Sequence, residues 1–213
     1  MWRHSTSTAL VASMLILAGC GSVSVQHSAV WNKPVPALAT VPAAAAVGAD
    51  TGVEFQQAIG HMQAGNWDAA IAQLETLTAT HGQFAGPWLN LGIAYTRSGA
   101  VDKARNAFET AAARNPRQAE AWNQLGMLHR RGGSLQQAAT MYLRAIEVAP
   151  DHADSHWNLA VLYDQYLPNY ATALHHLQRY QQLTGAGDPQ VSRWLAELQS
   201  HTAPNMTAGA NGQ

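Results

Sequence analysis

The chain has 213 residues, of which 12% are charged, with a formal net charge of −1 and a single cysteine. Charge this sparse and balanced lacks the basic stripe that neutralises phosphates, so no nucleic-acid partner is expected. One cysteine excludes an intramolecular disulfide, and this length corresponds to one or two domains.

An apolar run occupies residues 9–18 and leads into the tetrapeptide LAGC at residues 17–20. A transmembrane helix needs about 20 apolar residues, so this run is too short to span a bilayer. The tetrapeptide resembles the lipobox of bacterial lipoproteins. That resemblance implies that residues 1–19 are a signal peptide and that Cys20 is acylated, with palmitate as the expected kind of chain. An ordinary secretory signal with an incidental cysteine, or an uncleaved hydrophobic tail, is the alternative.

The residue after the cysteine is Gly21. Lipoproteins retained in the inner membrane usually carry Asp there, so the resemblance favours the periplasmic face of the outer membrane as the location. Residues 20–50 are rich in Ala and Pro and almost uncharged. This composition predicts a semi-extended tether between the lipid anchor and a folded body.

Residues 85–118 and 119–152 contain one pattern written twice. Seven positions recur with an offset of 34 residues: Trp88, Leu91, Gly92, Gly99, Ala104, Ala111 and Pro116 return as Trp122, Leu125, Gly126, Gly133, Ala138, Ala145 and Pro150. This period is typical of a solenoid built from helix–turn–helix units. The recurring residues are expected to pack the helices together.

Weaker copies flank the central pair at residues 51–84 and 153–187, as terminal repeats of a solenoid often do. In the last copy the second helix is expected one residue late, after the proline turn at residues 166–169. Residues 188–200 then predict a capping helix with one apolar stripe. Residues 201–213 are small and polar and predict a disordered tail.

The pattern Trp-x-x-Leu-Gly-x-x-Tyr, followed by Gly, Ala, Phe, Ala and Pro, resembles the tetratricopeptide repeat (TPR) over about residues 51–200. The resemblance implies an all-α TPR solenoid of four repeats, residues 51–187, closed by a C-terminal capping helix. It also implies a protein–protein interaction role, because the motif is specific for the fold and not for a chemistry.

The family's partner-binding groove is lined by the fifth, ninth and outer positions of the first helices. Carried onto this sequence, the groove residues are Phe55, Ile59, Met62, Leu89, Ile93, Arg97, Asn123, Met127, Arg130, Trp157, Val161 and Asp164. The ninth position is apolar in all four repeats, which predicts an exposed apolar strip for a hydrophobic or amphipathic segment. Apart from Asn123, the residues of a carboxylate clamp are missing. The alternative is that these side chains pack on neighbouring helices, or that the cap covers them.

Ten histidines raise the question of a metal site. His152 and His156 straddle the start of the fourth copy, and the adjacent His175 and His176 point to different faces. No metal-ligand motif, nucleophile elbow or phosphate loop accompanies them. We therefore expect no enzyme activity, no metal, no cofactor and no small-molecule substrate.

Taken together, these features predict a non-catalytic outer-membrane TPR lipoprotein that binds proteins of the bacterial envelope. Similar architectures occur among lipoproteins that assist pilus and secretin assembly, and among adaptors of peptidoglycan-remodelling enzymes. A metal-dependent or enzyme-associated accessory role is the hypothesis of another class. The metal content of the purified body would separate it from a pure scaffold.

Overall fold

The computed structural model describes residues 49–185 and 187–203 of the chain. Within these residues it contains nine α-helices and no strand. The helices are α1 (Ala49–Gln63), α2 (Trp67–Thr80), α3 (Ala85–Ser98), α4 (Val101–Arg114), α5 (Ala119–Arg131), α6 (Leu135–Val148), α7 (Ala153–Gln165), α8 (Tyr170–Thr184) and α9 (Pro189–Thr202).

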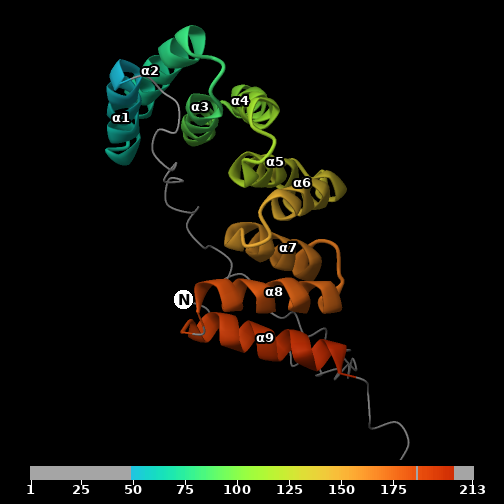
Figure 1. Cartoon of the computed structure of the whole chain (residues 1–213). Coiled ribbons are helices and arrows are strands. Elements are labelled where there is room, and N and C mark those ends of the chain that lie inside the picture. The colour runs from blue at the N-terminus through green and yellow to red at the C-terminus, as the bar shows by residue number, and fades with distance from the viewer. Residues whose placement is uncertain (1–48, 186, 204–213) are drawn as a thin grey trace, which may run out of the picture. The chain divides into compact units, whose positions relative to one another are not determined.

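Consecutive helices pack against each other along the whole series, so that four hairpins and a last single helix follow one another in chain order (Figure 1). The hairpins are α1–α2, α3–α4, α5–α6 and α7–α8, which we call repeats 1 to 4. The first helices of repeats 2, 3 and 4 begin at Ala85, Ala119 and Ala153, at the predicted 34-residue spacing. The all-α solenoid of four repeats with a capping helix is confirmed.

Close approach of the two helices in repeats 2 and 3 depends on one glycine in each. A Cβ added to Gly92 would lie 2.5 Å from the Phe108 ring, and one added to Gly126 would lie 2.5 Å from the Tyr142 ring. Real Cβ atoms do not come this close to other carbons, so only glycine lets these rings lie against the first helix. The prediction that the recurring residues pack the helices together is confirmed for these two glycines.

The turn inside each of the first three repeats also uses a glycine. Gly99 and Gly133 adopt φ values of +83° and +77°, a left-handed conformation that L side chains rarely adopt. Repeat 4 carries Leu167 and Pro168 in this turn, and α8 begins 35 residues after α6. The predicted one-residue insertion is therefore confirmed in this turn.

Each central repeat is also fixed to the loop before it through its tryptophan. Trp88 donates from Nε1 to the carbonyl oxygen of Gly82, and Trp122 donates to that of Pro116, both at 2.9 Å. These bonds satisfy a carbonyl group in the connection between repeats while the indole packs against the core.

The ends of the described region differ slightly from the prediction. Helix α1 already begins at Ala49, inside the expected tether, and α9 continues through His201 to Thr202, so the expected tail starts later. None of the described helices combines the length and apolar content that a membrane span requires. The expected signal peptide and Cys20 lie outside the described residues, as do most of the tether and the tail from residue 204 onward.

Candidate protein-binding groove

The predicted groove residues lie on the first helices, but most of them are buried. At the ninth position, Ile93, Met127 and Val161 are only 6%, 8% and 3% exposed, and Ile59 is half-buried. At the fifth position, Phe55, Leu89 and Asn123 are buried and Trp157 is half-buried. Met62 is buried as well.

The physical reason is contact between first helices of neighbouring repeats. Helix α1 contacts α3, and α5 contacts α7, in addition to the second helices that pack beside them. Phe55, Leu89 and Ile93 consequently belong to one continuous hydrophobic core, and Met127 belongs to a second cluster with Tyr142. The expected exposed apolar strip is therefore wrong, whereas partner contact at the predicted residues stays a prediction.

Asn123 links repeat 3 to repeat 4 from inside the protein. Its Oδ1 accepts a hydrogen bond from Asn158 Nδ2 at 2.9 Å and another from Ser155 Oγ at 3.3 Å. The Ser155 backbone N–H in turn donates to Nδ1 of His152, whose Nε2 lies 3.2 Å from Glu120. Because Asn123 has no exposed surface, its evident role is to set the register between the repeats.

The capping helix occupies part of the predicted groove of repeat 4. Trp194 of α9 stacks edge-on against Trp157, with ring centroids 5.3 Å apart, and donates from Nε1 to Asp164 at 3.1 Å. Tyr180 adds a third ring, 5.0 Å from Trp157. In repeat 4, therefore, the capping helix covers predicted groove residues, as the alternative interpretation of the sequence proposed.

What the first helices of repeats 2 and 3 leave accessible is basic. Arg97 and Arg131 are exposed and Arg130 is half-buried, all in the last turns of α3 and α5. The Arg97 guanidinium lies 5.8 Å from the Trp67 ring, and the Arg130 guanidinium lies 6.0 Å from the Tyr166 ring. Such cation–π contacts hold the guanidinium planes without neutralising their charge.

Lys103, in the first turn of α4, lies 5.2 Å from the Tyr95 ring. We call Arg97, Lys103, Arg130 and Arg131 the basic edge. Among the described residues, none of these four side chains forms an ion pair. Tyr95 itself donates to Glu75, and burial, with that hydrogen bond, raises the pKa of Tyr95 to about 12.

The sequence contained a signal for this edge that composition alone hides. Residues 85–152 hold eight of the 12 Lys and Arg residues and only five of the 13 Asp and Glu residues. Residues 51–84 hold three acidic residues and no Lys or Arg. Counting charged residues in each repeat, rather than over the whole chain, would have indicated that the two central repeats are basic.

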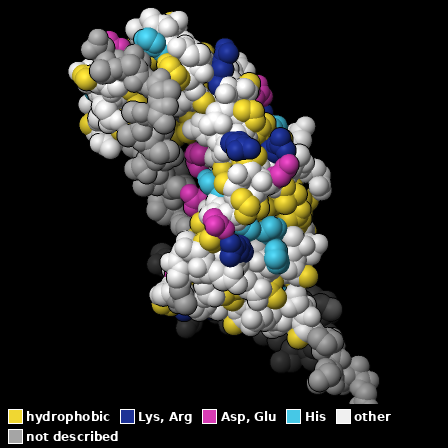
Figure 2. Space-filling model, viewed as in Figure 1, with side chains coloured by type: hydrophobic (Ala, Val, Ile, Leu, Met, Phe, Trp, Pro, Cys, Tyr) yellow, Lys and Arg dark blue, Asp and Glu magenta, His cyan; other side chains and the backbone are white. Residues whose placement is uncertain are grey.

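Three of the described histidines, His156, His175 and His176, lie together without forming a metal centre. Figure 2 shows histidine side chains gathered beside acidic and basic side chains on the visible face. In the described part of the chain, no three His, Cys, Asp or Glu side chains are placed to hold a metal ion together. The buried pair His156 and His176 has ring nitrogens 3.1 Å apart.

Comparison with known proteins identifies the repeat. A tetratricopeptide repeat model matches residues 55–105, 89–147 and 126–190, which together cover more than half of the chain. This chain belongs to the tetratricopeptide repeat family. Among curated protein sequences, none matches it significantly.

Several solved TPR structures share the fold. MamA from Desulfovibrio magneticus RS-1 has a TM-score of 0.61 and 16% identity, covering 73% of this chain and 87% of that one. A thermophilic TPR protein of Thermus thermophilus has a TM-score of 0.60 and 20% identity, covering 71% and 82%. The pilF protein of Pseudomonas aeruginosa has a TM-score of 0.63 and 20% identity, covering 71% and 68%. At these identities the likeness concerns the fold alone.

Proposed function

We propose that this TPR protein is a lipid-anchored scaffold of the outer membrane that binds proteins of an envelope assembly, with pilus or secretin assembly as the machine it serves. The TPR fold is a protein–protein interaction fold, and the four stacked repeats are the observation that carries the scaffold function. The proposed anchor rests on the resemblance of residues 17–20 to a lipobox.

The surface available to a partner supports binding of a polar rather than a purely apolar segment. The apolar ninth positions are covered, while the basic edge is accessible and has no acidic partner among the described residues. Charged surfaces of this kind speed association with oppositely charged partners and select against partners of like charge. The assignment to pilus assembly rests on the arrangement of a lipobox before a short TPR array, and the shared fold of the pilF protein is compatible with it.

Crosslinking in cells tests the scaffold function directly. A photoreactive residue is placed at Arg97 or at Arg131, both exposed, with a third placement at the exposed Gln136 of α6 as a control for position. Recovery of a pilus or secretin component from the first two positions, and not from the control, supports the proposal. Recovery of a peptidoglycan-remodelling enzyme overturns the pilus assignment, and recovery of no protein from either position overturns the scaffold at this edge.

The anchor requires a separate experiment. Cys20→Ser is expected to leave the precursor unprocessed and without labelled fatty acid, whereas Ser22→Ala should be processed and labelled like the wild type. Equal fatty-acid labelling of Cys20→Ser and wild type would remove the lipoprotein part of the proposal and leave the scaffold part intact.

A further inference from the structure

Tyr166 and Tyr170 stand at the two ends of the turn inside repeat 4, and both are exposed, by 46% and 37%. They are two of the five large hydrophobic side chains that are exposed in the described part of the chain. At the position of Tyr166, the first three repeats carry the small residues Ala64, Ser98 and Gly132. The TPR fold therefore does not require an aromatic ring at this position.

The turn of repeat 4 holds its two tyrosines in a fixed arrangement. The backbone N–H groups of Tyr166 and Leu167 both donate to the carbonyl oxygen of Leu162, at 3.0 and 2.9 Å. The backbone N–H of Asn169 donates to the carbonyl oxygen of Tyr163 at 2.8 Å. Leu167 packs against the buried apolar cluster of repeats 3 and 4. The turn is thus fastened to the core through Leu167, while the rings at its two ends stay exposed.

Residues of two other helices lie beside these rings. The Arg130 guanidinium, at the end of α5, lies 6.0 Å from the Tyr166 ring. The His201 ring, at the end of α9, stacks on Tyr170 with ring centroids 4.6 Å apart and an angle of 22° between the planes. Repeat 3, repeat 4 and the capping helix therefore contribute to one surface, which we call the turn patch and define as Arg130, Tyr166, Tyr170 and His201.

The segments that form the turn patch carry positive charge and no acidic residue. Residues 129–137, 165–172 and 199–203 contain neither Asp nor Glu. Arg130 forms no ion pair with any residue that the structure describes. Asp164, the nearest acidic residue to the turn along the chain, already accepts a hydrogen bond from α9. The charge of Arg130 thus remains available to an anionic partner.

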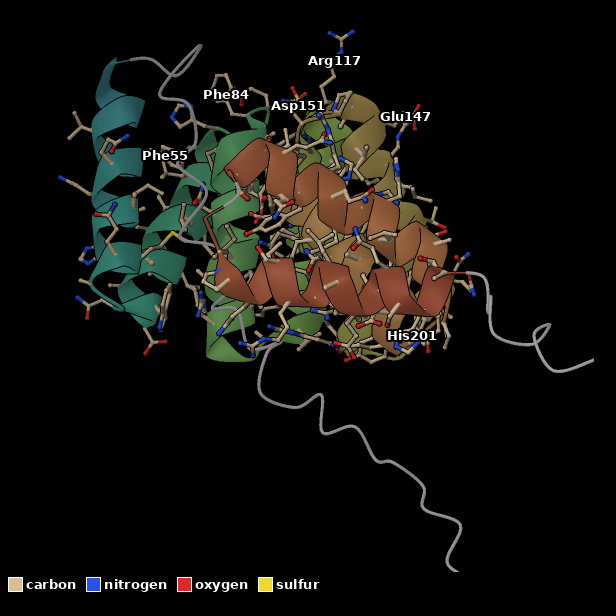
Figure 3. The ribbon with its side chains drawn as sticks, turned by 90° about the horizontal axis from the view of Figure 1, so that it is seen from below. Phe55, Phe84, Arg117, Glu147, Asp151 and His201 are labelled. Carbon is tan, nitrogen blue, oxygen red and sulfur yellow. The ribbon has the colours of Figure 1, made fainter. Side chains whose placement is uncertain are left out.

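The opposite side of the repeats has a different character. Figure 3 shows His201 on one side of the ribbon and, on the other side, three residues of the loops that join successive repeats: Phe84, Arg117 and Asp151. Arg117 and Asp151 bear opposite charges, and Asp151 forms an ion pair with Arg179. Exposed aromatic rings beside an unpaired cation are therefore a feature of the turn side.

An anionic lipid surface fits the chemistry of the turn patch. Tyrosine rings are enriched where proteins meet the headgroup region of a bilayer, because the ring is apolar and its hydroxyl is polar. A guanidinium can bind the oxygens of a lipid phosphate through two parallel hydrogen bonds. A cation and aromatic rings at one level of a surface serve both kinds of contact.

The proposed anchor would keep such a surface close to this patch. Residues 21–48 separate Cys20 from α1, and a flexible chain of that length spans about 30 Å. A body tied to the bilayer over so short a distance meets it at a high effective concentration, so even a weak contact is populated.

We propose that the turn patch lies on a phospholipid surface, with Arg130 bound to the phosphate of an anionic lipid and the rings of Tyr166 and Tyr170 among the headgroups. The choice of a lipid partner rests on the proposed anchor, and the inference adds the orientation of the anchored body. The loops between repeats then face away from the bilayer. The rest of the basic edge, from Arg97 to Arg131, stays beside the membrane for the protein partner.

Vesicle flotation tests this contact without the contribution of acyl chains. The full-length chain carrying Cys20→Ser is mixed with vesicles of phosphatidylcholine, or of phosphatidylcholine and phosphatidylglycerol in equal parts. The fraction of protein that floats with the vesicles in a sucrose gradient is then measured. Any binding through residues 1–19 is shared by all variants, so each variant is compared against the same background.

Two matched pairs of variants isolate the turn patch. Arg130→Gln removes its cation, and Arg117→Gln makes the same change at an exposed residue on the opposite side (Figure 3). Tyr166→Ser removes an exposed ring, and Leu143→Ser removes an apolar side chain of α6 that is equally exposed, at 46%. Circular dichroism and thermal unfolding establish that each variant is folded. Tyr166→Ser keeps the test decisive if the half-buried Arg130 proves necessary for stability.

We expect tighter binding to the vesicles that contain phosphatidylglycerol, and release from them at high salt. Arg130→Gln should weaken that binding by about fivefold, the effect of one cation near an anionic surface. Tyr166→Ser should weaken it by about threefold, because the ring no longer enters the headgroup region. Arg117→Gln and Leu143→Ser should each change it by no more than about twofold.

Three results of the flotation experiment would overturn the proposal. They are equal binding to the two kinds of vesicle, equal losses in Arg130→Gln and Arg117→Gln, and equal binding by Tyr166→Ser and Leu143→Ser. In cells, a photoreactive residue at Tyr170 is expected to capture phospholipid. Capture of a protein there instead would assign the turn patch to a protein partner and overturn the membrane contact.

The outcome is distinguishable from failure of the proposed function. Absence of fatty-acid label on the wild type would remove the anchor, while flotation of the Cys20→Ser chain would still report on the turn patch. Loss of the membrane contact in flotation would leave both the acylation of Cys20 and the capture of a protein from Arg97 unaffected.

Discussion

His156 donates a hydrogen bond from Nε2 to the carbonyl oxygen of Pro150, 3.0 Å away and six residues earlier. Trp88 and Trp122 make the corresponding bond with their indole N–H groups, also to the sixth residue before them. His156 thus fills the tryptophan position of repeat 4. Because Nε2 carries the proton in the neutral ring, Nδ1 must accept, and it lies 3.1 Å from Nδ1 of His176, which then donates.

This histidine pair is expected to make folding stability depend on pH below neutrality. Burial, with help from His156 and His175, lowers the pKa of His176 to about 4, and burial also lowers the pKa of His156. In the unfolded chain both histidines have a pKa of about 6.5, so they become protonated at a pH at which they are still neutral in the folded chain. Stability is therefore fully present above about pH 6.5 and declines as the pH falls toward about 4, by up to about 3 kcal/mol for His176. Urea unfolding at several pH values measures this loss.

Variants at two histidines isolate the effect from the general acid response of the carboxylates. His176→Gln retains an amide donor for His156 but does not titrate, so its stability should fall less steeply with pH than that of the wild type. His201→Gln, at an exposed position in α9, should follow the wild type. Parallel pH profiles for wild type and His176→Gln would show that the pair does not control acid stability.

Packing of the two helices in repeat 3 gives a second prediction, with a control inside the same chain. Gly126→Ala forces a Cβ to 2.5 Å from the Tyr142 ring and should lower the free energy of unfolding by about 1–3 kcal/mol. Gly60→Ala, in the exposed part of α1 with no atom within 4 Å of the new Cβ, should raise it by up to about 1 kcal/mol. Chemical denaturation measures both, and two changes of the same sign would contradict the packing account.

The fold could be predicted because its determinants repeat along the sequence. Gly92 and Gly126, or Trp88 and Trp122, keep the same spacing because each fills the same space in successive units. The role of His156 escaped prediction because it does not look like a tryptophan. It shares with tryptophan only a flat ring and an N–H at a similar reach, and that similarity becomes visible through the bond to Pro150.

The groove was predicted less well because the exposure of a side chain on a first helix depends on how closely the neighbouring repeats pack against that helix. The sequence shows that Ile93 and Met127 are apolar, but not that the first helices approach closely enough to cover them. Nor does a sequence pattern reveal that the Tyr142 side chain is completely buried, since the sequence alone does not show which faces of α6 are covered. Only the packed structure shows this.

Charge placed at a ninth position provides a direct test of this burial. Met127→Glu puts a carboxylate at a residue that is 8% exposed and should lower the free energy of unfolding by at least about 2 kcal/mol. Leu143→Glu makes a comparable change in the same repeat at a residue that is 46% exposed, and its effect should stay within about 0.5 kcal/mol. Equal unfolding curves for Met127→Glu and wild type would mean that Met127 is exposed, as the sequence predicted for the apolar strip.

The capping helix gives the last prediction, because α9 covers the open side of repeat 4. Trp194 is buried against Trp157 and donates to Asp164, and its helix packs along α8. A chain that stops after residue 187 loses this cover, whereas one that stops after residue 203 keeps all of α9. The shorter chain should unfold at lower urea concentration and should self-associate as its concentration rises, because terminal repeats need a polar outer face.

Light scattering coupled to gel filtration measures the association, and the longer truncation is the control for removal of the tail. A shorter chain that stays monomeric and as stable as the longer one would show that repeat 4 closes the stack without its cap.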